Sequence, residues 1–379
     1  MLSQKHLFQL PSNIHYLNGA YMSPLLISSE EAAYNDLIRK RNPASILATD
    51  FFTDARLLRV NFGKLINCSA ERVAIIPSVS YGIMNAVQNI PTDIGQSVIM
   101  VSEEFPSDFY AVKAWCNRHS KTVQMIHPPD TDKQRGALWN QEILNNITED
   151  TCAVVISSIH WTDGTIFDLV NIGKKCKENN VLFIVDGSQS LGALPIDVAA
   201  CNIDALVCTG YKWLLGGYSL GLAYYSPRYD HGCPIEESWM TRANAEDFTT
   251  LTIYTDDYLP GAMRYNVGEF SNFILLPLLN TALEQILAWG VDNIQNYSKE
   301  LIAPLTDFLE QNGFWIEEQN WRAQHLFGFR IPDHLDRDTL VNQLKSQNII
   351  VSARGNSIRV STHVYNGVED VEALMEALS

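Results

Sequence analysis

Short β-branched runs alternate with longer helical patterns between residues 70 and 225. The runs expected to form strands are 73–76, 98–101, 123–126, 152–157, 181–185, 205–209 and 220–225. Segments that suit helices lie between most of them, such as 81–89, 108–119 and 170–179. This rhythm predicts an α/β fold with a mostly parallel, seven-stranded sheet covered by helices on both faces. Ligands of such sheets bind beyond the carboxyl ends of the strands.

The alternation of strand and helix patterns ends after Pro227. Residues 228–268 are polar and rich in Asp and Glu, and a long loop of this kind is often functional. The last part of the chain has helical patterns at 272–289, 336–347 and 368–378, and short strands at 326–331, 349–352 and 357–361. We therefore expect a large ligand-binding domain over 16–265. A smaller α+β domain is expected over 266–379, and it also includes residues 1–15.

The charge of the chain excludes some classes of partner. The formal net charge is −16 and the sequence pI is about 4.9, which argues against a surface that binds nucleic acid or an anionic membrane. No apolar stretch approaches the roughly 18–20 residues that span a bilayer. The first residues lack the continuous apolar core of a secretory signal, so we expect a cytoplasmic protein.

The cysteines and histidines show no ligand pattern. Seven cysteines are scattered without a CxxC pair, and the nine histidines lack an HExxH or comparable spacing. Most of the thiols are expected to be small buried side chains. We expect neither a disulfide framework nor a metal site.

A lysine and an aspartate stand at the ends of two predicted strands. Lys212 follows the run 205–209, and Asp186 directly follows the run 181–185. Pyridoxal 5'-phosphate (PLP) needs such a pair, because the lysine forms a Schiff base with its aldehyde and the aspartate keeps its ring nitrogen protonated, so that the ring acts as an electron sink. Either residue alone is explained by an ordinary surface lysine or a strand-end cap. Together they predict a PLP site.

The segment from Tyr16-Leu-Asn-Gly-Ala20 to Val364-Tyr-Asn366 resembles the class V aminotransferase family of fold-type I PLP-dependent enzymes. This family includes cysteine desulfurases, selenocysteine lyases, kynureninases and isopenicillin N epimerase-like proteins. The most specific element is Asp186-x-x-Gln189 with Tyr211-Lys212. The resemblance implies that Lys212 is the Schiff-base lysine and that Asp186 is the partner of the pyridine nitrogen. It further implies that Gln189 hydrogen-bonds the phenolic oxygen of PLP, where kynureninases carry a histidine.

The turn Pro77-Ser-Val-Ser-Tyr-Gly82 lies between a predicted strand and a predicted helix. A helix N-terminus offers free N–H groups to a phosphate, although an ordinary serine N-cap explains the turn equally well. The family has a Gly-Thr-Thr-like turn here, which implies that Val79 through its backbone and Ser80 through its hydroxyl hold the phosphate. Thr209 and Tyr211 match the other side of this phosphate site.

Two further segments resemble parts of the family's active site. Phe105-Pro-Ser-Asp108 resembles a kynureninase segment, which implies that Phe105 stacks on the pyridine ring and that Asp108 lies near the phosphate. A core phenylalanine and a helix-capping aspartate are the alternative. His160 falls on the family's asparagine position, which faces the cofactor and the substrate carboxylate. A structural histidine explains His160 equally well.

The resemblance also extends to the substrate and to a second subunit. Arg359 matches the family's carboxylate-binding arginine, and Arg354 is a nearby second candidate. In the family, a threonine after the Arg-x-x-x-Gly segment reaches the phosphate in the neighbouring subunit, but Glu269 takes its place here. Ser271 or Asn272 could replace that contact. A homodimer with shared active sites is the expectation.

The sequence disfavours some of the reactions that members of this family catalyse. A persulfide-forming desulfurase needs a cysteine shortly before the Arg359 segment, and residues 348–356 contain none. Gln189 and the segment Asn18-Gly-Ala20 argue against kynureninase itself, whereas Phe105 to Asp108 favour it. We interpret the chain as a PLP-dependent lyase of an α-amino acid, selenocysteine lyase-like or kynureninase-like. An aminotransferase of the same family is the alternative, and a PLP-binding protein without turnover is a further one. The motifs of nucleotide enzymes are absent.

Overall fold

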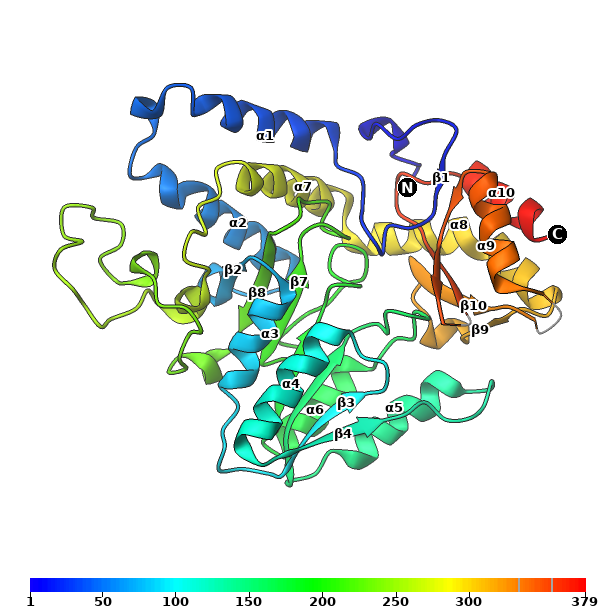
Figure 1. Ribbon diagram of the computed structural model, residues 1–379, viewed down its shortest axis with the longest axis horizontal. Coiled ribbons are helices and arrows are strands. Elements are labelled where there is room, and N and C mark those ends of the chain that lie inside the picture. The colour runs from blue at the N-terminus through cyan, green and yellow to red at the C-terminus, as the bar shows by residue number, and fades with distance from the viewer. Residues whose placement is uncertain (333–334, 356) are drawn as a thin grey trace.

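The predicted sequence of strands and helices is present in the structure, a computed structural model that describes residues 1–332, 335–355 and 357–379 (Figure 1). The strands are β1 (His15–Tyr16), β2 (Val73–Ile76), β3 (Ser97–Val101), β4 (Thr122–Ile126), β5 (Thr151–Ser157), β6 (Leu182–Asp186), β7 (Ala205–Thr209), β8 (Gly221–Tyr225), β9 (Trp315–Ile316), β10 (Leu326–Arg330), β11 (Ile349–Ile350), β12 (Ser352–Arg354) and β13 (Ser357–Ser361). The helices are α1 (Ile27–Arg39), α2 (Asp50–Ile66), α3 (Val79–Gln88), α4 (Pro106–His119), α5 (Arg135–Asn146), α6 (Leu169–Glu178), α7 (Leu275–Trp289), α8 (Val291–Gln311), α9 (Arg337–Ser346) and α10 (Val368–Leu378).

The large sheet confirms the predicted α/β class. Its seven strands lie in the order β2-β8-β7-β6-β5-β3-β4, and β8 runs antiparallel to both of its neighbours. The pairs β4–β3, β3–β5, β5–β6 and β6–β7 are parallel. Five of the strands are buried along their whole length, as near-continuous apolar runs require. Each of the seven predicted strands falls within two residues of its observed bounds.

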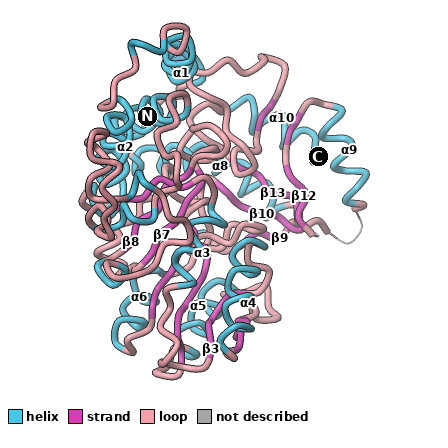
Figure 2. The backbone as a smooth tube through the Cα atoms, turned by 60° about the vertical axis from the view of Figure 1, so that its left-hand side comes forward, coloured by secondary structure: helices cyan, strands magenta, loops and turns pink. Residues whose placement is uncertain are grey.

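A smaller α+β unit follows in the C-terminal part of the chain (Figures 1 and 2). Its four-stranded sheet has the order β12-β13-β10-β9 and adjacent pairs are antiparallel. The short strand β1 pairs with β11, which attaches the N-terminal part of the chain to this unit. Helix α7, however, packs against α1 and α2. Its contacts therefore join the first part of the segment 266–379 to the large unit.

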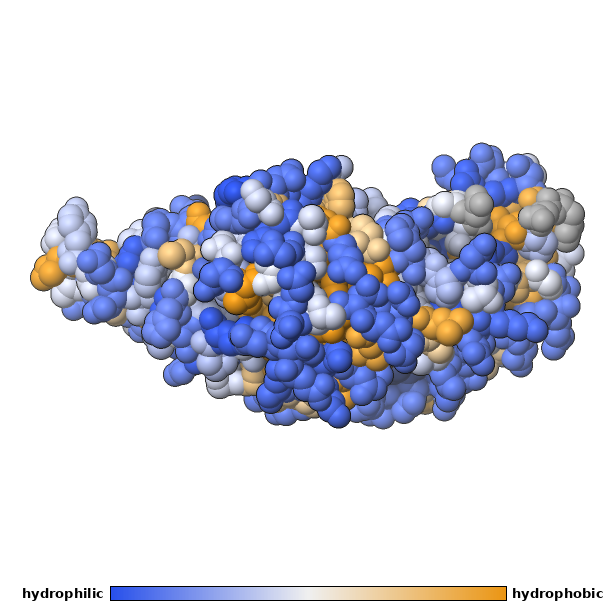
Figure 3. Space-filling view, turned by 90° about the horizontal axis from the view of Figure 1, so that it is seen from below, coloured by the Kyte–Doolittle hydropathy of each residue, from blue (hydrophilic) through white to orange (hydrophobic). Residues whose placement is uncertain are grey.

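The long polar segment after β8 contains only short 3₁₀ turns, such as Trp239–Thr241 and Gly261–Tyr265. Part of it projects from the body of the molecule (Figure 1). Tyr254, within this segment, is 95% exposed. One face of the molecule is mostly hydrophilic, with hydrophobic side chains in small groups (Figure 3). Among the described helices, none combines the length and the apolar character needed to span a bilayer.

Candidate active site

The carboxyl ends of the central strands bring the predicted residues together. Ser157 at the end of β5 pairs with Asp186 at the end of β6, and Asp186 pairs with Val207 on β7. A cavity of about 300 Å³ opens at this edge. Its lining includes most of the predicted cofactor-binding residues, which are Val79, Ser80, Phe105, Asp186, Gln189, Thr209, Tyr211 and Lys212.

Lys212 lies in a tight turn that follows β7. The turn closes through a 2.8 Å hydrogen bond from the Gly216 N–H to the Gly210 carbonyl. A Cβ on Gly210 would lie 2.7 Å from the Leu220 carbonyl oxygen, so the turn requires glycine there. The lysine is only 8% exposed. Burial lowers the pKa of Lys212 to about 8, with Asp186 acting in the opposite direction.

Asp186 and Asp108 form a pair of buried carboxyl groups. Asp186 accepts a 2.8 Å hydrogen bond from the Ser188 N–H. No donor among the described residues reaches the Asp108 carboxyl, which lies against Asp186. Burial and then the charge of Asp186 raise the pKa of Asp108 well above its usual range. Burial also raises the pKa of Asp186, although Ser188 and then Lys212 oppose this rise. Two carboxyls in contact do not both ionise readily, so a shared proton resides on Asp108, whose pKa is raised further, and Asp186 is the member that ionises first.

The first turn of α3 forms another wall of the cavity. Ser78 is its N-cap and accepts a hydrogen bond from the Tyr81 N–H, while its hydroxyl lies 2.9 Å from that of Ser80. The first N–H groups of a helix, here from Val79 and Ser80, have no partner within the helix. Together with the positive end of the helix dipole they favour an anion such as a phosphate. Thr209 and Tyr211 line the same cavity.

Two aromatic rings form the flat walls of the cavity. The Lys212 Nζ lies 5.5 Å from the centre of the Phe105 ring, which contacts Trp161 edge-on at 5.7 Å. The Trp161 indole N–H donates a 2.7 Å hydrogen bond to the Glu103 carbonyl, which holds the ring in place. The Phe105 ring, beside the Nζ of Lys212, offers a flat heteroaromatic ring an aromatic surface to pack against.

The side chain of Gln189 is held from two directions. Its Oε1 accepts a 3.0 Å hydrogen bond from the Trp213 indole N–H, and its Nε2 donates a 3.2 Å bond to the Ala20 carbonyl. The backbone carbonyl of Gln189 lies 2.8 Å from Nε2 of His325. Burial lowers the pKa of His325 to about 4, so this ring is neutral and donates through Nε2–H.

A second cavity of about 270 Å³ adjoins the first and shares Lys212, Gln189 and Trp161 with it. Arg354 on β12 and Arg359 on β13 line this cavity. Arg359 is 1% exposed and donates a 2.7 Å hydrogen bond from Nη1 to the Trp161 carbonyl. Burial, and then the nearby Arg354 charge, lower the pKa of Arg359 to about 9.

The structure does not bring His160 to either cavity. Its ring contacts Trp139 at 5.1 Å, its Nε2 lies 3.1 Å from the Ser102 carbonyl, and its Nδ1 lies 3.3 Å from Asp163. Burial opposes the charged ring, but the Asp163 carboxylate outweighs it and raises the pKa of His160. The side chain of Trp161, the next residue, occupies the cavity wall instead. In this geometry His160 does not contact a substrate directly.

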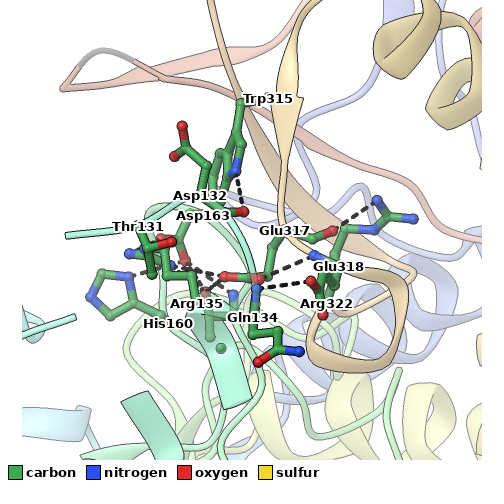
Figure 4. A network of polar contacts seen from close by, with 12 residues as sticks. Thr131, Asp132, Gln134, Arg135, His160, Asp163, Trp315, Glu317, Glu318 and Arg322 are labelled. Carbon is green, nitrogen blue, oxygen red and sulfur yellow. Dashed lines mark hydrogen bonds and ion pairs between the residues drawn. The ribbon is translucent and has the colours of Figure 1, made fainter. Parts of the chain in front are cut away.

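His160 belongs to a buried polar network between the two units (Figure 4). Arg135 at the start of α5 contacts Asp163 at 3.0 Å and Glu317, beyond β9, at 3.1 Å. All three side chains are almost fully buried. The network therefore anchors the segment that carries Trp161 to the small unit.

These residues fit PLP. A buried amine, an anionic carboxyl, a helix N-terminus for a phosphate and an aromatic wall surround one cavity. Sequence reasoning missed several other lining residues, including Trp161, Tyr218 and Tyr21. Of these three residues, only Trp161 could have been found from the sequence, because it stands next to His160 in a segment that resembles the family's active site.

Glu269, Ser271 and Asn272 lie away from this site. They line a third cavity of about 530 Å³ beside α1. The Ser271 hydroxyl donates to the Phe51 carbonyl, and Asn272 Oδ1 accepts from the N–H groups at the start of α7. The lining of the two active-site cavities includes none of the seven cysteines, all of which the structure describes.

Comparisons with known proteins agree with this geometry. The model of the family described as aminotransferase class-V matches residues 32–374. The uncharacterized aminotransferase YcbU of Bacillus subtilis is 25% identical over 85% of this chain and 82% of its own length. A kynureninase of Geobacillus thermodenitrificans is 22% identical over 96% of this chain and 87% of its own length. A cysteine desulfurase of Thermococcus onnurineus shares the fold, with a TM-score of 0.85 at 18% identity, and the match covers 100% of this chain and 98% of that one.

Proposed function

Because the chain belongs to the class V aminotransferase family, whose members are PLP-dependent enzymes, we propose that it is a lyase that removes a side-chain group from an α-amino acid. The observation that carries the proposal is the placement of Lys212, Asp186 and Arg359 around two joined cavities. Lys212 would hold the aldehyde of PLP, Asp186 its ring nitrogen, and the turn at Val79 and Ser80 its phosphate.

Bound PLP supplies an electron sink for negative charge at the substrate Cα. The protein's part is to position groups and to move a proton. Arg359 presents a guanidinium to the α-carboxylate and so orients the substrate. Once the substrate amine has taken its place on the aldehyde, the free Nζ of Lys212, whose pKa burial lowers to about 8, would be the base that takes the α-proton. Asp186 is the more readily ionised of the two buried carboxyls beside it, and Phe105 and Trp161 line the same cavity.

The cavity favours a lyase that needs no cysteine nucleophile. None of the seven cysteines lines either active-site cavity, which disfavours persulfide transfer through a cysteine. The kynureninase relatives, which align over most of the chain, support cleavage of a side-chain bond. Transamination is the second candidate, since the relative YcbU is named an aminotransferase and the first proton step is the same.

The test is to mix purified holoprotein with L-cysteine, L-selenocysteine, L-kynurenine or L-serine and to identify products while recording the cofactor absorbance. A lyase releases the side-chain group and its absorbance returns to the starting form. A transaminase yields the keto acid with its side chain intact and needs a second keto acid to restore the absorbance. The absence of any spectral change or product with a broad panel of amino acids would argue for a PLP-binding protein without turnover.

We further propose that two copies of the chain associate through the face that contains the third cavity. Leu37, Trp239 and Ile274 at this cavity are 52%, 43% and 38% exposed, an apolar group of the kind that partner surfaces cover. The substitution Leu37→Glu is expected to shift the mass in light scattering from twice 42.6 kDa to one chain. Leu138→Glu, at an exposed leucine on α5, is the matched control. A single-chain mass for the unmodified protein would contradict the proposal.

A further inference from the structure

We propose that the preferred substrate carries a second acidic group on its side chain, and that Arg354 binds this group while Arg359 binds the α-carboxylate. The chemical class is therefore an α-amino acid with a side-chain carboxylate or sulfinate. The inference rests on the proposed function, because it concerns the substrate of the same site.

The substrate side of the site contains more positive charge than one α-carboxylate neutralises. Arg354, Arg359 and Lys212 line the second cavity, and its lining includes no Asp or Glu. Neither arginine has an acidic partner within ion-pair distance among the described residues. The Nε atoms of both arginines are buried and have no hydrogen-bond partner there.

The two guanidinium groups occupy different positions along the cavity wall. Arg354 pairs with Ser357 across the β12–β13 hairpin, and Arg359 stands two residues further along β13, so both side chains project from the same face of the sheet. Arg359 is the deeper of the two and holds the Trp161 carbonyl. Arg354 is half-buried and lies over the Trp161 ring at 5.5 Å.

A single carboxylate satisfies one guanidinium through a bidentate pair. With the α-carboxylate on Arg359, the Arg354 guanidinium remains without an anion, and a partly buried charge without a partner is costly. A second acidic group on the substrate removes that cost. The cavity of about 270 Å³ is large enough for a short acidic side chain beside the α-carbon.

The competing substrate class is an aromatic amino acid. Tyr21, Trp161 and Tyr218 line the same cavity and offer apolar contacts. The rings of Tyr21 and Tyr218 are exposed, however, and the Trp161 ring already contacts both Phe105 and Arg354. Arg354 donates a 2.8 Å hydrogen bond to the Ala353 carbonyl and lies over the Trp161 ring, but no carboxylate among the described residues balances its charge.

The experiment measures equilibrium binding to holoprotein from the change in cofactor absorbance, with pairs of amino acids that differ only in charge. L-aspartate is compared with L-asparagine and L-glutamate with L-glutamine, and L-cysteine sulfinate and L-phenylalanine complete the panel. At least one acid is expected to bind about tenfold or more tightly than its amide, as a charge-assisted hydrogen bond implies.

The variant Arg354→Gln is expected to bind the acid only as tightly as the amide, because it lacks the charge that distinguishes the two. Arg354→Lys, which keeps the charge, should restore part of the preference, and Arg118→Gln, at an exposed arginine on α4, should change nothing. A normal cofactor absorbance in each variant shows that the protein is folded and loaded.

Equal affinity for acids and amides in the unmodified protein would overturn the inference. So would a preference for L-phenylalanine, or an acid preference that survives in Arg354→Gln. Each of these results leaves the cofactor absorbance and its response to amino acids in place. Failure of the proposed function is different, because the absorbance or its response to every amino acid would then be missing.

Discussion

The indole N–H of Trp213 donates a 3.0 Å hydrogen bond to Oε1 of Gln189, and this bond fixes the orientation of the Gln189 carboxamide. Tryptophan is only a donor, so the oxygen of the amide must face Trp213. The NH₂ group therefore faces the Ala20 carbonyl and the cavity. It is thus a donor available to an oxygen of the cofactor.

The substitution Trp213→Phe keeps an aromatic ring but removes this N–H. PLP binding is expected to weaken by about tenfold, since a buried acceptor without its donor costs about 1–3 kcal/mol and the amide is free to turn. Titration of the apoprotein with PLP measures the affinity. In a Gln189→Leu background the same substitution should have little further effect. An equal loss in both backgrounds would mean that Trp213 acts through packing alone.

Substitutions of the two buried carboxyl groups are expected to have different effects on activity. Asp108 holds the proton, so Asp108→Asn changes little in charge and should leave kcat/KM within about fivefold of the unmodified enzyme. Asp186→Asn removes the anion and should lower kcat/KM about 100-fold or more, equivalent to about 2.7 kcal/mol. Steady-state kinetics with the best substrate measure both. Equal losses in the two variants would refute the assignment of the proton.

The lowered pKa of Lys212 predicts how cofactor attachment depends on pH. Only the neutral amine attacks the PLP aldehyde, so the rate constant should rise with pH and level off near pH 8, the pKa to which burial lowers this lysine. An ordinary lysine would show a rate that keeps rising toward a pKa of about 10.4. Stopped-flow absorbance of the apoprotein mixed with PLP gives the profile.

The network around Arg135 is expected to contribute to stability. Glu317→Gln removes one carboxylate from a buried guanidinium and should lower the free energy of unfolding by about 3 kcal/mol. The cofactor absorbance should stay unchanged, because Glu317 lines neither active-site cavity. Urea denaturation measures the loss, and Glu372→Gln, at an exposed position of α10, is the control with an effect of about 0.5 kcal/mol or less. A loss as small as that of the control would contradict a structural role of this ion pair.

The large sheet was predictable because its strands are short apolar runs separated by helical patterns. Lys212 and Asp186 were predictable as a pair for the same reason, since parallel strands end at one edge. The domain boundary was harder to place. Helix α7 is apolar on the side that meets α1 and α2, and its sequence alone does not say which neighbours bury that side.

Other parts of the site depend on details that a sequence does not contain. His160 stands at the start of a turn that is closed by a 2.9 Å hydrogen bond from the Gly164 N–H to the His160 carbonyl. This turn, which the sequence pattern does not specify, places Trp161 rather than His160 in the cavity wall. The contact between Asp108 and Asp186 joins the first turn of α4 to the end of β6, and only the folded chain brings them together. Tyr21 and Tyr218 lie in loops without a periodic pattern.

The most direct test of the account is to reduce purified holoprotein with borohydride and to map its peptides by mass spectrometry. Reduction makes the link between a lysine and the PLP aldehyde permanent. The account predicts the mass of the reduced cofactor on the peptide that contains Lys212 and its absence from Lys212→Ala. No adduct, or an adduct on a different lysine, would contradict the assignment of Lys212 and the mechanism that depends on it.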